Sequence, residues 1–303
     1  MSTKKKLSDK DIPGRLAAGG LKVLGQLPIG TSGALGRQTG RIAWHLAKGS
    51  TNVTKRNLEL CFPDKSAEDI EKLAKESIIE TMMTAFEMAS AWVQPVDELL
   101  KKISHVDNEH IYLDALKTGR GIVLLVPHFG NWELCNYFMA KQNSSLLAMY
   151  KAGKSPALNR LILHSRQQIT EMVPADKKGV LAMFNAVKQG RVTGLLPDQE
   201  PSIKSGVWAP FFGIPALTPT LVSKVLQKTN AIAMGYGCQR NPDGKSYHIF
   251  YEKVDDAIYS DDIETSATAM NHCIERIILR DPAQYQWEYK RFKRRPDGGP
   301  NPY

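Results

Sequence analysis

The segment Gly121-Ile-Val-Leu-Leu-Val-Pro-His-Phe-Gly-Asn-Trp-Glu133 determines how the fold is interpreted. Its first part, residues 121–126, is a continuous apolar run, which is typical of a strand buried on both faces. Pro127 ends the run because proline has no backbone N–H group, and Asn131 is a suitable N-cap for a helix that follows. The segment therefore predicts a core strand, a short loop and a helix.

This order places His128 at the carboxyl end of the strand and Glu133 in the first turn of the helix. In open α/β sheets, ligands bind at this edge. A histidine beside a carboxylate suits general-base chemistry, so we predict that His128 is the base and Glu133 its orienting partner. Two structural alternatives stay open: His128 as an ordinary loop residue, and Glu133 as a complement to the helix dipole. Zinc is disfavoured, because the spacing differs from His-Glu-x-x-His and no cysteine cluster assists.

Beyond residue 120, apolar patterns typical of strands and helices alternate. The predicted strands are 121–126, 145–150, 192–196, 230–237 and 247–254. The predicted helices are 131–140, 156–171, 178–189, 218–228 and 262–279. This alternation indicates an α/β fold, with a mixed central sheet flanked by helices, and we assign it to a domain of residues 51–303. A capping box at Ser66-Ala-Glu-Asp69 predicts a further helix that ends near Val93.

Residues 1–50 are assigned to a basic amphipathic segment with two helices broken by glycines, 15–26 and 32–47. Apolar side chains alternate there with arginine and lysine, a pattern that suits the plane of a membrane interface. A helical hairpin packed on the body of the protein is an equally good interpretation. No stretch has the roughly 20 apolar residues of a spanning helix, so none is predicted.

Composition narrows the class of protein and of partner. The chain has 303 residues, enough for a full core, and a net charge of +9 that favours an anionic partner such as a membrane surface, a nucleic acid or an acidic protein. The four cysteines lack metal-ligand or redox spacing and are predicted to be reduced core residues: Cys61, Cys135, Cys238 and Cys273. Nucleic acid is disfavoured, because no helix-turn-helix, zinc-finger or aromatic-basic sheet signature appears.

Five sequence blocks follow one another along nearly the whole chain. They are Arg56-Asn-Leu-Glu-Leu-Cys-Phe-Pro63, His128-Phe-Gly-Asn-Trp-Glu133, Ser155-Pro-Ala-Leu-Asn-Arg-Leu-Ile-Leu-His-Ser-Arg166, Leu196-Pro-Asp-Gln199 with Gly206-Val-Trp-Ala-Pro-Phe-Phe-Gly213, and Gln284-Tyr-Gln-Trp-Glu-Tyr-Lys-Arg-Phe-Lys293 with Arg295-Pro296. In this order and spacing the blocks resemble those of the bacterial lipid A biosynthesis acyltransferases, the late acyltransferases of the lysophospholipid acyltransferase superfamily. One His-x4-Glu block alone is weak evidence, whereas five blocks in order are specific.

The resemblance implies a glycerolipid acyltransferase-like fold and an acyl transfer reaction. The donor would be acyl carrier protein, the acceptor a hydroxyl of a lipid A precursor, and the pathway that of lipopolysaccharide or lipooligosaccharide. It also implies a peripheral or monotopic protein on the cytoplasmic face of the inner membrane, bound to an anionic surface. No cofactor and no metal are expected, since the acylated carrier is a co-substrate. Because no serine or cysteine is placed as a nucleophile, direct transfer in a ternary complex is preferred.

The same resemblance assigns His128 and Glu133 to catalysis. It assigns substrate or oxyanion binding to a second set of residues: Asn131, Lys151, Asn159, Arg166, Asp198 and Arg291. Backbone N–H groups from Gly130 to Trp132 are further oxyanion candidates. Asp198 follows the predicted strand 192–196, where a loop-capping role is its alternative.

Three positions depart from the family pattern. Lys151 stands where arginine is usual, and Gln199 and Tyr289 each replace a frequent histidine. These differences bear on the exact acceptor and the membrane mode more than on the reaction class. Two alternatives to acylation of a lipid A precursor stay open. One is the same chemistry on a lysophospholipid or another membrane lipid, and the other is a non-catalytic protein that binds the membrane surface.

Overall fold

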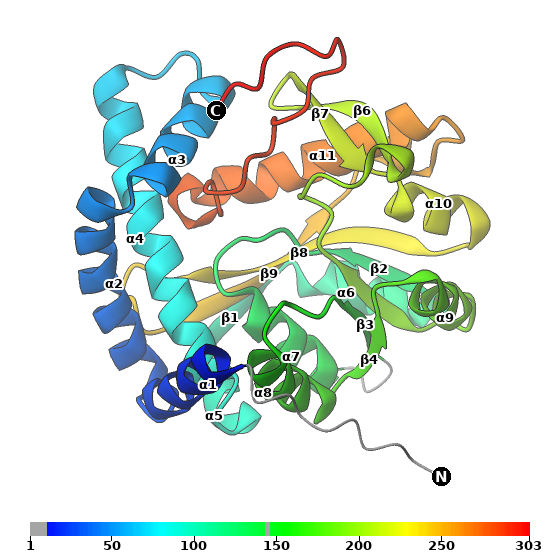
Figure 1. Ribbon diagram of the computed structural model, residues 1–303. Coiled ribbons are helices and arrows are strands. Elements are labelled where there is room, and N and C mark those ends of the chain that lie inside the picture. Colours follow the sequence, from blue (N-terminus) through cyan, green and yellow to red (C-terminus); the bar gives the residue numbers. More distant parts are fainter. Residues whose placement is uncertain (1–10, 143–145) are drawn as a thin grey trace.

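A seven-stranded sheet forms the centre of the protein in the computed structural model, which describes residues 11–142 and 146–303 (Figure 1). In spatial order the strands are β1 (Ile103–Asp107), β9 (Tyr247–Lys253), β8 (Ile232–Arg240), β2 (Ile122–Leu125), β5 (Val192–Leu195), β3 (Leu147–Tyr150) and β4 (Glu171–Pro174). Neighbouring strands are parallel except for β8 and β9, which pair antiparallel. The predicted α/β class with a mixed sheet is confirmed.

The helices of the described residues cover both faces of the sheet and one flank. They are α1 (Ile12–Leu24), α2 (Ile29–Leu46), α3 (Lys48–Cys61), α4 (Ala67–Ala91), α5 (Val96–Leu100), α6 (Glu109–Lys117), α7 (Trp132–Gln142), α8 (Pro156–Gln167), α9 (Lys177–Lys188), α10 (Leu221–Lys228) and α11 (Ile263–Arg280). A separate hairpin pairs β6 (Gly206–Phe211) with β7 (Ile214–Pro219). The five helices predicted after residue 130 are all present, whereas α3, α5, α6, β1, β4 and the hairpin were not predicted.

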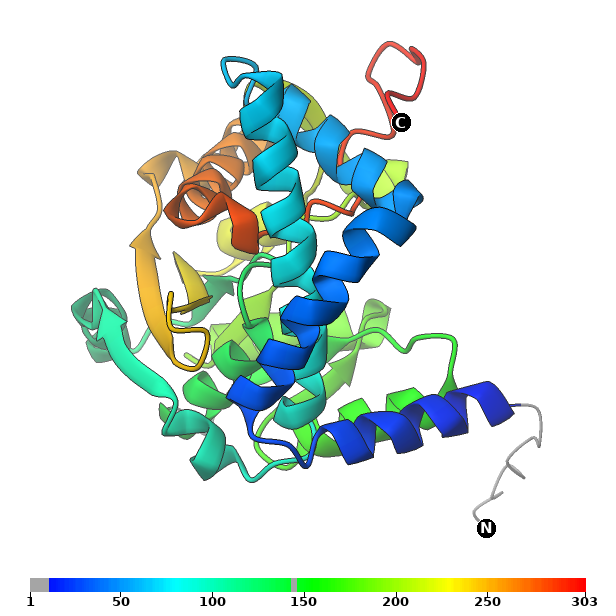
Figure 2. The same ribbon diagram turned by 90° about the vertical axis from the view of Figure 1, so that its left-hand side faces the viewer.

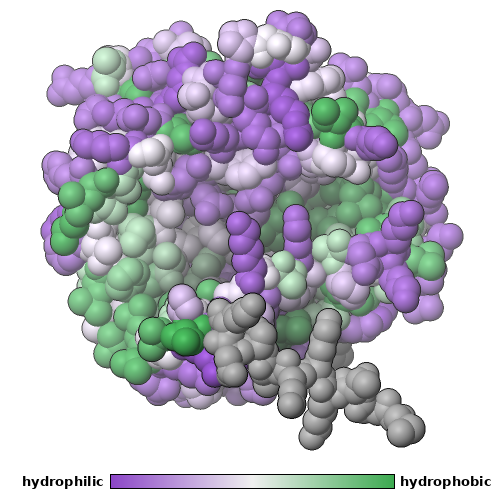
Figure 3. Space-filling model, in the orientation of Figure 1, coloured by the Kyte–Doolittle hydropathy of each residue, from purple (hydrophilic) through white to green (hydrophobic). Residues whose placement is uncertain are grey.

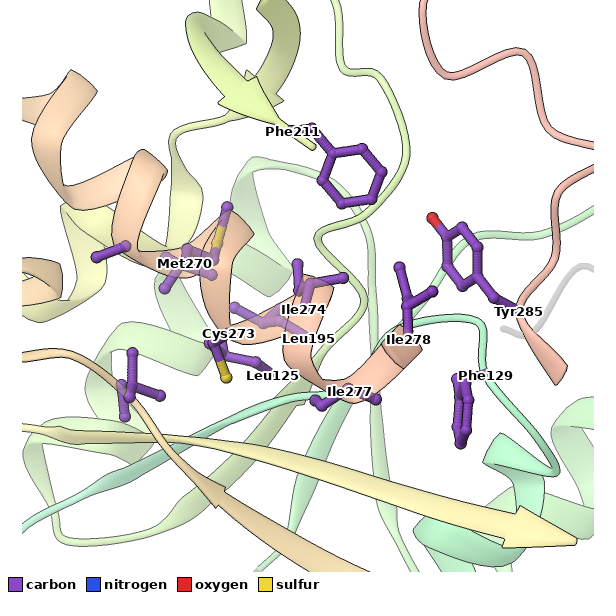
Figure 4. Packing of buried hydrophobic residues seen from close by; sticks show 14 of the residues in the cluster. Leu125, Phe129, Leu195, Phe211, Met270, Cys273, Ile274, Ile277, Ile278 and Tyr285 are labelled. Atoms are coloured by element: carbon purple, nitrogen blue, oxygen red, sulfur yellow. The ribbon is translucent and has the colours of Figure 1, made fainter. Parts of the chain in front are cut away.

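Strand β2 separates two hydrophobic clusters because its side chains alternate between the two faces of the sheet. Ile122 and Leu124 belong to a cluster with side chains of α6 and α7. Val123 and Leu125 belong to a second cluster with side chains of α9, α10 and α11. Figure 4 shows this second cluster, in which α11 presents Met270, Cys273, Ile274, Ile277 and Ile278 toward the sheet and the neighbouring loops. All four cysteines are free and buried, as predicted.

Helices α2 and α4 cross in close contact on the flank of the molecule (Figure 2). Ser66 caps α4 as expected, since its hydroxyl accepts from the Asp69 N–H group at 3.1 Å. Glycines bring the two helices together: a Cβ at Gly36 or Gly40 would lie 2.6 Å from a backbone Cα of α4. The predicted N-terminal helices are thus present as α1 and α2, and α2 packs on the body of the protein. None of the described helices combines the length and the apolar character needed to cross a membrane.

The first and last sequence blocks meet in space, although more than 200 residues separate them. Asn57 in α3 donates from Nδ2 to the carbonyl oxygens of Trp287 and Tyr289, at 2.7 and 2.8 Å. Its Oδ1 accepts from the Tyr303 hydroxyl, and Arg56 donates to the Pro302 carbonyl. The Asn57 side chain therefore fastens the C-terminal segment to the helical flank.

Glu288 in that segment is a buried carboxyl group whose two oxygens lack a hydrogen-bond partner within the described part of the chain. Burial raises its pKa to about 7, against smaller opposing effects of its own N–H group and of Thr81. In the unfolded chain the pKa is near 4.5, so folding favours the protonated form. This protonation therefore contributes to the free energy of unfolding in full below pH 4.5, and the contribution is lost as the pH rises through about 7.

We therefore expect the Glu288→Gln variant to gain thermal stability over the wild type at pH 8 and to gain much less at pH 5. Differential scanning calorimetry at both pH values measures the two shifts in Tm. Glu76→Gln is the matched control, because Glu76 is exposed on the surface of α4. Equal shifts at pH 5 and pH 8 would contradict the assignment of a raised pKa to Glu288.

Candidate active site

His128 and Asp198 face each other across two neighbouring strands. Leu125 of β2 pairs in register with Leu195 of β5, and each of the two residues lies three positions beyond its strand. Asp198 Oδ1 lies 2.9 Å from His128 Nδ1, and Oδ2 accepts from the His128 backbone N–H group at 2.8 Å. Both carboxylate oxygens of Asp198 thus bind the same residue, and the side chain is almost completely buried.

This contact sets the tautomer of the imidazole. An ionised carboxylate only accepts hydrogen bonds, so Nδ1 carries the proton and Nε2 of the neutral ring has a free lone pair. Burial disfavours the cationic ring, but the charge and the hydrogen bond of Asp198 outweigh that effect and raise the pKa of His128 above its ordinary value. Burial likewise opposes ionisation of Asp198, yet His128 holds the pKa of that carboxyl below its usual range. Gln199 lies 3.4 Å from Nε2.

The backbone around His128 is held on two sides. Gly130 has a φ of +54°, and a Cβ there would lie 2.0 Å from the Cys238 carbonyl oxygen. The N–H groups of Gly130 and Asn131 donate to the carbonyls of Gln284 and Cys238, and the Gln286 N–H group donates to the His128 carbonyl. The loop therefore lies between the end of β8 and the C-terminal segment. Because the Gly130 and Asn131 N–H groups are already bonded, they are not the oxyanion donors that the sequence suggested.

Glu133 does not orient His128, which corrects the pairing predicted from the His-x4-Glu spacing. Its carboxylate binds Arg166 of α8 in a two-pronged ion pair, with Nε at 3.1 Å from Oε2 and Nη2 on Oε1. The reason is geometric: the first turn of α7 directs Glu133 toward α8, whereas Asp198 reaches the imidazole from the adjacent strand end. Glu133 is buried, and burial disfavours the Arg166 cation, but Glu133 outweighs this and raises the pKa of the guanidinium.

Asn131 caps helix α7 and binds a buried carboxylate. Its Oδ1 accepts from the Leu134 N–H group at 3.4 Å, the N-cap contact that was predicted, and its Nδ2 donates to Glu87 at 3.3 Å. Glu87 in turn forms two hydrogen bonds with the buried Arg240 at the end of β8. Asn131 is completely buried and does not line the cavity described next, so its predicted contact with substrate is not supported.

A cavity of about 630 Å³ opens beside His128, Glu133 and Arg166. Figure 3 shows a hollow lined largely by hydrophobic side chains on this face of the molecule. The apolar residues of the wall come from β3, α8, β4, the end of β5 and the start of α10: Ala148, Met149, Leu158, Ile162, Met172, Leu195, Leu196, Leu221 and Val222. Two of the predicted binding residues, Lys151 and Asn159, also line it. Asn159 holds the adjacent loop, since it bonds the Gly153 N–H and carbonyl groups at 2.8 Å.

Two smaller cavities adjoin the main one. A space of about 140 Å³ shares His128 and Trp132 with it and lies between α4 and the C-terminal segment. A second space, of about 70 Å³, shares Trp132 and Leu196 and extends the apolar wall toward Met139 and Tyr236. His128 and Trp132 are in edge contact, with ring centroids 5.1 Å apart, and therefore separate the main cavity from the space beside α4.

Arg291 does not reach any of these cavities, which corrects its assignment as a binding residue. It is 3 % exposed and donates to the Leu217 carbonyl and the Thr218 hydroxyl of the hairpin. Its guanidinium also lies over the ring of Phe211. The neighbouring cations Lys293 and Arg294 form ion pairs with Glu200, so much of the basic tail binds the protein itself.

The sequence did not anticipate Trp132 in the cavity wall, nor Asp198 as the partner of His128. The sequence did contain a pattern that indicates the His128–Asp198 contact. Both residues follow apolar strands that, once paired in parallel, end at the same level of the sheet.

Comparisons with known proteins identify the family of this chain. Residues 5–294 match the family model of the bacterial lipid A biosynthesis acyltransferases. The chain is 30% identical to a lipid A biosynthesis lauroyltransferase of Escherichia coli, over 95% of this chain and 94% of the relative. It is 29% identical to the palmitoleoyltransferase of that organism over 90% and 88% of the two chains, and 24% identical to its myristoyltransferase over 87% and 81%. The chain therefore belongs to the bacterial lipid A biosynthesis acyltransferase family and is an acyltransferase.

Proposed function

We propose that the protein transfers a fatty acyl group from acyl carrier protein to a hydroxyl of a lipid A precursor. The observation that carries this proposal is the His128–Asp198 pair at the mouth of a mainly apolar cavity. The names of the relatives support lipid A as the pathway, since they include lauroyl, palmitoleoyl and myristoyl transferases of lipid A biosynthesis. No cofactor takes part in the proposed reaction, because the acylated carrier is itself a co-substrate.

In this mechanism His128 is the general base. Its Nε2 removes the proton of the acceptor hydroxyl while the oxygen attacks the thioester carbonyl carbon. Asp198 holds the ring through Nδ1–H and stabilises the imidazolium that forms. When the tetrahedral intermediate collapses, the carbon–sulfur bond breaks and the imidazolium returns the proton to the departing thiolate. The products are an ester and the free thiol of the carrier.

The Glu133–Arg166 ion pair takes a different role in the proposal. Glu133 occupies Nε and Nη2 of the guanidinium, which leaves Nη1 for the substrate. A fixed cation beside the reacting carbonyl stabilises the negative charge of the tetrahedral intermediate. Glu133 therefore acts as a positioning residue for Arg166 in place of the orienting role that its spacing suggested.

The apolar wall of the main cavity suits a hydrocarbon chain. The adjoining space near Met139 and Tyr236 extends that wall into the interior. Lys151 and Lys154 also line the cavity, are exposed, and suit the phosphate groups of a lipid A precursor. We assign the acyl chain to the wall and the phosphorylated sugar to these two lysines.

We further propose that α1 and α2 lie on an anionic membrane surface, as inferred for residues 1–50. Six large apolar side chains of these helices are exposed: Ile12, Leu16, Val23, Leu35, Ile42 and Leu46. Their spacing places them on one face of each helix, and Figure 3 shows hydrophobic surface in the region of α1 and α2. Arg15 and Lys22 of α1 line a groove with Arg160 and His164 of α8. A basic apolar surface beside the active site suits the inner membrane, where the lipid acceptor resides.

Replacing His128 with alanine is expected to lower acyl transfer at least about 10²-fold, the usual loss when a general base is removed. The assay incubates the full-length protein in vesicles with acyl carrier thioesters of mixed chain length and a lipid A precursor, and mass spectrometry weighs the product. His272→Ala, an exposed change on α11, is the control. Wild-type turnover by a folded His128→Ala protein would exclude this mechanism. Acylation of a lysophospholipid alone would support the alternative acceptor, and no transfer to any acceptor would favour a binding protein.

The Asp198→Asn variant tests which carboxylate orients the base. Activity requires neutral His128, so it rises with pH through the pKa of that residue. Since Asp198 raises this pKa, we expect the variant to shift the acid limb of kcat/KM to lower pH and to lower kcat by about 10²–10⁴-fold. In Glu133→Gln the acid limb stays in place, because Asp198 remains the charge that acts on the ring. A shift of the acid limb in Glu133→Gln but not in Asp198→Asn would contradict this assignment and support the His128–Glu133 pairing predicted from the sequence.

The membrane proposal predicts that the double variant Leu16→Ser, Val23→Ser binds anionic vesicles at least about tenfold more weakly, because each large apolar side chain contributes on the order of 1.5 kcal/mol or more when buried. Sedimentation with phosphatidylglycerol-containing vesicles measures the change. Leu181→Ser is the matched control, since Leu181 is 62 % exposed on α9. Equal losses in both proteins would show that α1 has no special part in binding.

A further inference from the structure

Three side chains with metal-ligating atoms converge where β1 pairs with β9, outside the active site. His105 of β1 and His248 of β9 are neighbours in the register of the two strands. Their rings are stacked, with centroids 4.7 Å apart and planes inclined by 7°. Asp107 lies two residues beyond His105 on the same strand, and therefore on the same face. Among the described residues, one ligand atom from each side chain lies within 4.8 Å of the others.

Hydrogen bonds on the far side of each ring set the protonation of both histidines. Asn241 donates from Nδ2 to the hydroxyls of Ser104 and Ser246, which fixes its Oδ1 toward His248 Nδ1 at 2.8 Å. An amide oxygen only accepts, so the proton of His248 is on Nδ1. Ser104 donates to the Tyr247 carbonyl, and its oxygen is 2.8 Å from His105 Nδ1. Because that hydroxyl proton is already committed, His105 Nδ1 is also the donor.

Both neutral rings therefore present an unprotonated Nε2 beside the same carboxylate, with the two lone pairs in nearly parallel planes. Nε2 of His105 is 3.6 Å from Asp107 Oδ1, and Nε2 of His248 is 3.9 Å from Oδ2. These separations are too long for hydrogen bonds, and in these tautomers all four atoms are acceptors. Arg280 binds only one side of the carboxylate, through Oδ2 at 2.7 Å, and leaves Oδ1 facing the rings. Three acceptor groups this close together are an arrangement that a cation can bridge.

We propose that His105, His248 and Asp107 bind a divalent transition metal, with Zn²⁺ the preferred ion. Imidazole nitrogens with one carboxylate oxygen are a ligand set that zinc accepts, with a water in the fourth position. Tetrahedral zinc with bonds near 2.1 Å places its ligands about 3.4 Å apart, close to the 3.6 Å between His105 Nε2 and Asp107 Oδ1. Binding requires one of the two parallel rings to turn, so that both Nε2 lone pairs point at the ion. Asn241 and Ser104 supply the outer hydrogen bonds that hold metal-binding imidazoles.

The site would join the edge strand to the rest of the sheet. In the described structure β1 is the edge strand next to β9 and pairs with no other strand. Asn241 directly follows Arg240, the buried cation that binds Glu87 next to the catalytic loop. A metal bound by the folded protein stabilises it in proportion to the logarithm of metal concentration over Kd. Its expected effect is therefore on the stability of this edge.

The test uses the full-length protein after treatment with a chelator. Isothermal titration with Zn²⁺ alone should give one equivalent bound, and Co²⁺ should give the intense visible absorption of a tetrahedral site. We expect the double variant His105→Ala, His248→Ala to lose both signals. The Asn241→Ala variant keeps all three ligands and should bind about 10–100-fold more weakly, as for loss of an outer-shell partner.

Two variants serve as controls and should bind as the wild type does. His272→Ala removes an exposed histidine of α11, and His128→Ala removes the active-site histidine, so metal held at either place would be detected. Melting curves without metal confirm that each variant is folded. Absence of stoichiometric binding by the wild type, or unchanged affinity in the double histidine variant, would overturn the proposal. Loss of binding in His128→Ala would also overturn it, because the metal would then belong to the active site.

Discussion

The backbone geometry of the loop from His128 to Asn131 is the constraint on which the active site depends. A left-handed glycine lets the chain pass against the Cys238 carbonyl at a distance that excludes any side chain. The loop then bonds to β8 on one side and to the C-terminal segment on the other. Asn57 fastens that same segment to α3, so the first and last sequence blocks support the loop without lining the main cavity. The backbone contacts that stabilise the fold at this loop therefore also fix the position of His128.

Much of this architecture was predictable because long apolar runs and helical periodicity report burial directly. The strand at 121–126 and the helix that opens at the Ser66 cap are examples. The strands β1 and β4 were missed for a physical reason: they lie at the edges of the sheet, and their exposed or partly exposed residues show no continuous apolar run. The hairpin of β6 and β7 was missed because its core residue Phe211 owes its burial to distant partners such as Arg291.

For the site, sequence located His128 at the strand end but paired it with Glu133, whereas the structure pairs it with Asp198. Spacing along the chain favoured Glu133, since it is near His128 in sequence, whereas the actual partner Asp198 is 70 residues away. Only the parallel pairing of β2 and β5 brings the two together. Arg291 was assigned wrongly for the opposite reason. A cation in a basic run suggests a solvent-facing contact, yet this guanidinium is buried under the hairpin, where Nη1 and Nη2 donate to a backbone carbonyl and a hydroxyl.

The attachment of α1 to α8 has a thermodynamic consequence. Asp11, at the start of α1, accepts hydrogen bonds from the Ser155 hydroxyl and the Ala157 N–H group at the start of α8, each at 3.0 Å. The opposite face of α8 carries Leu158, Ile162 and Arg166 into the cavity. Under the proposed membrane contact, a surface that orders α1 would act on α8 through these two hydrogen bonds, and reciprocity would then require a ligand that orders α8 to strengthen the hold of α1 on that surface. Occupancy of the cavity and residence at the proposed lipid interface would then be coupled in a single equilibrium.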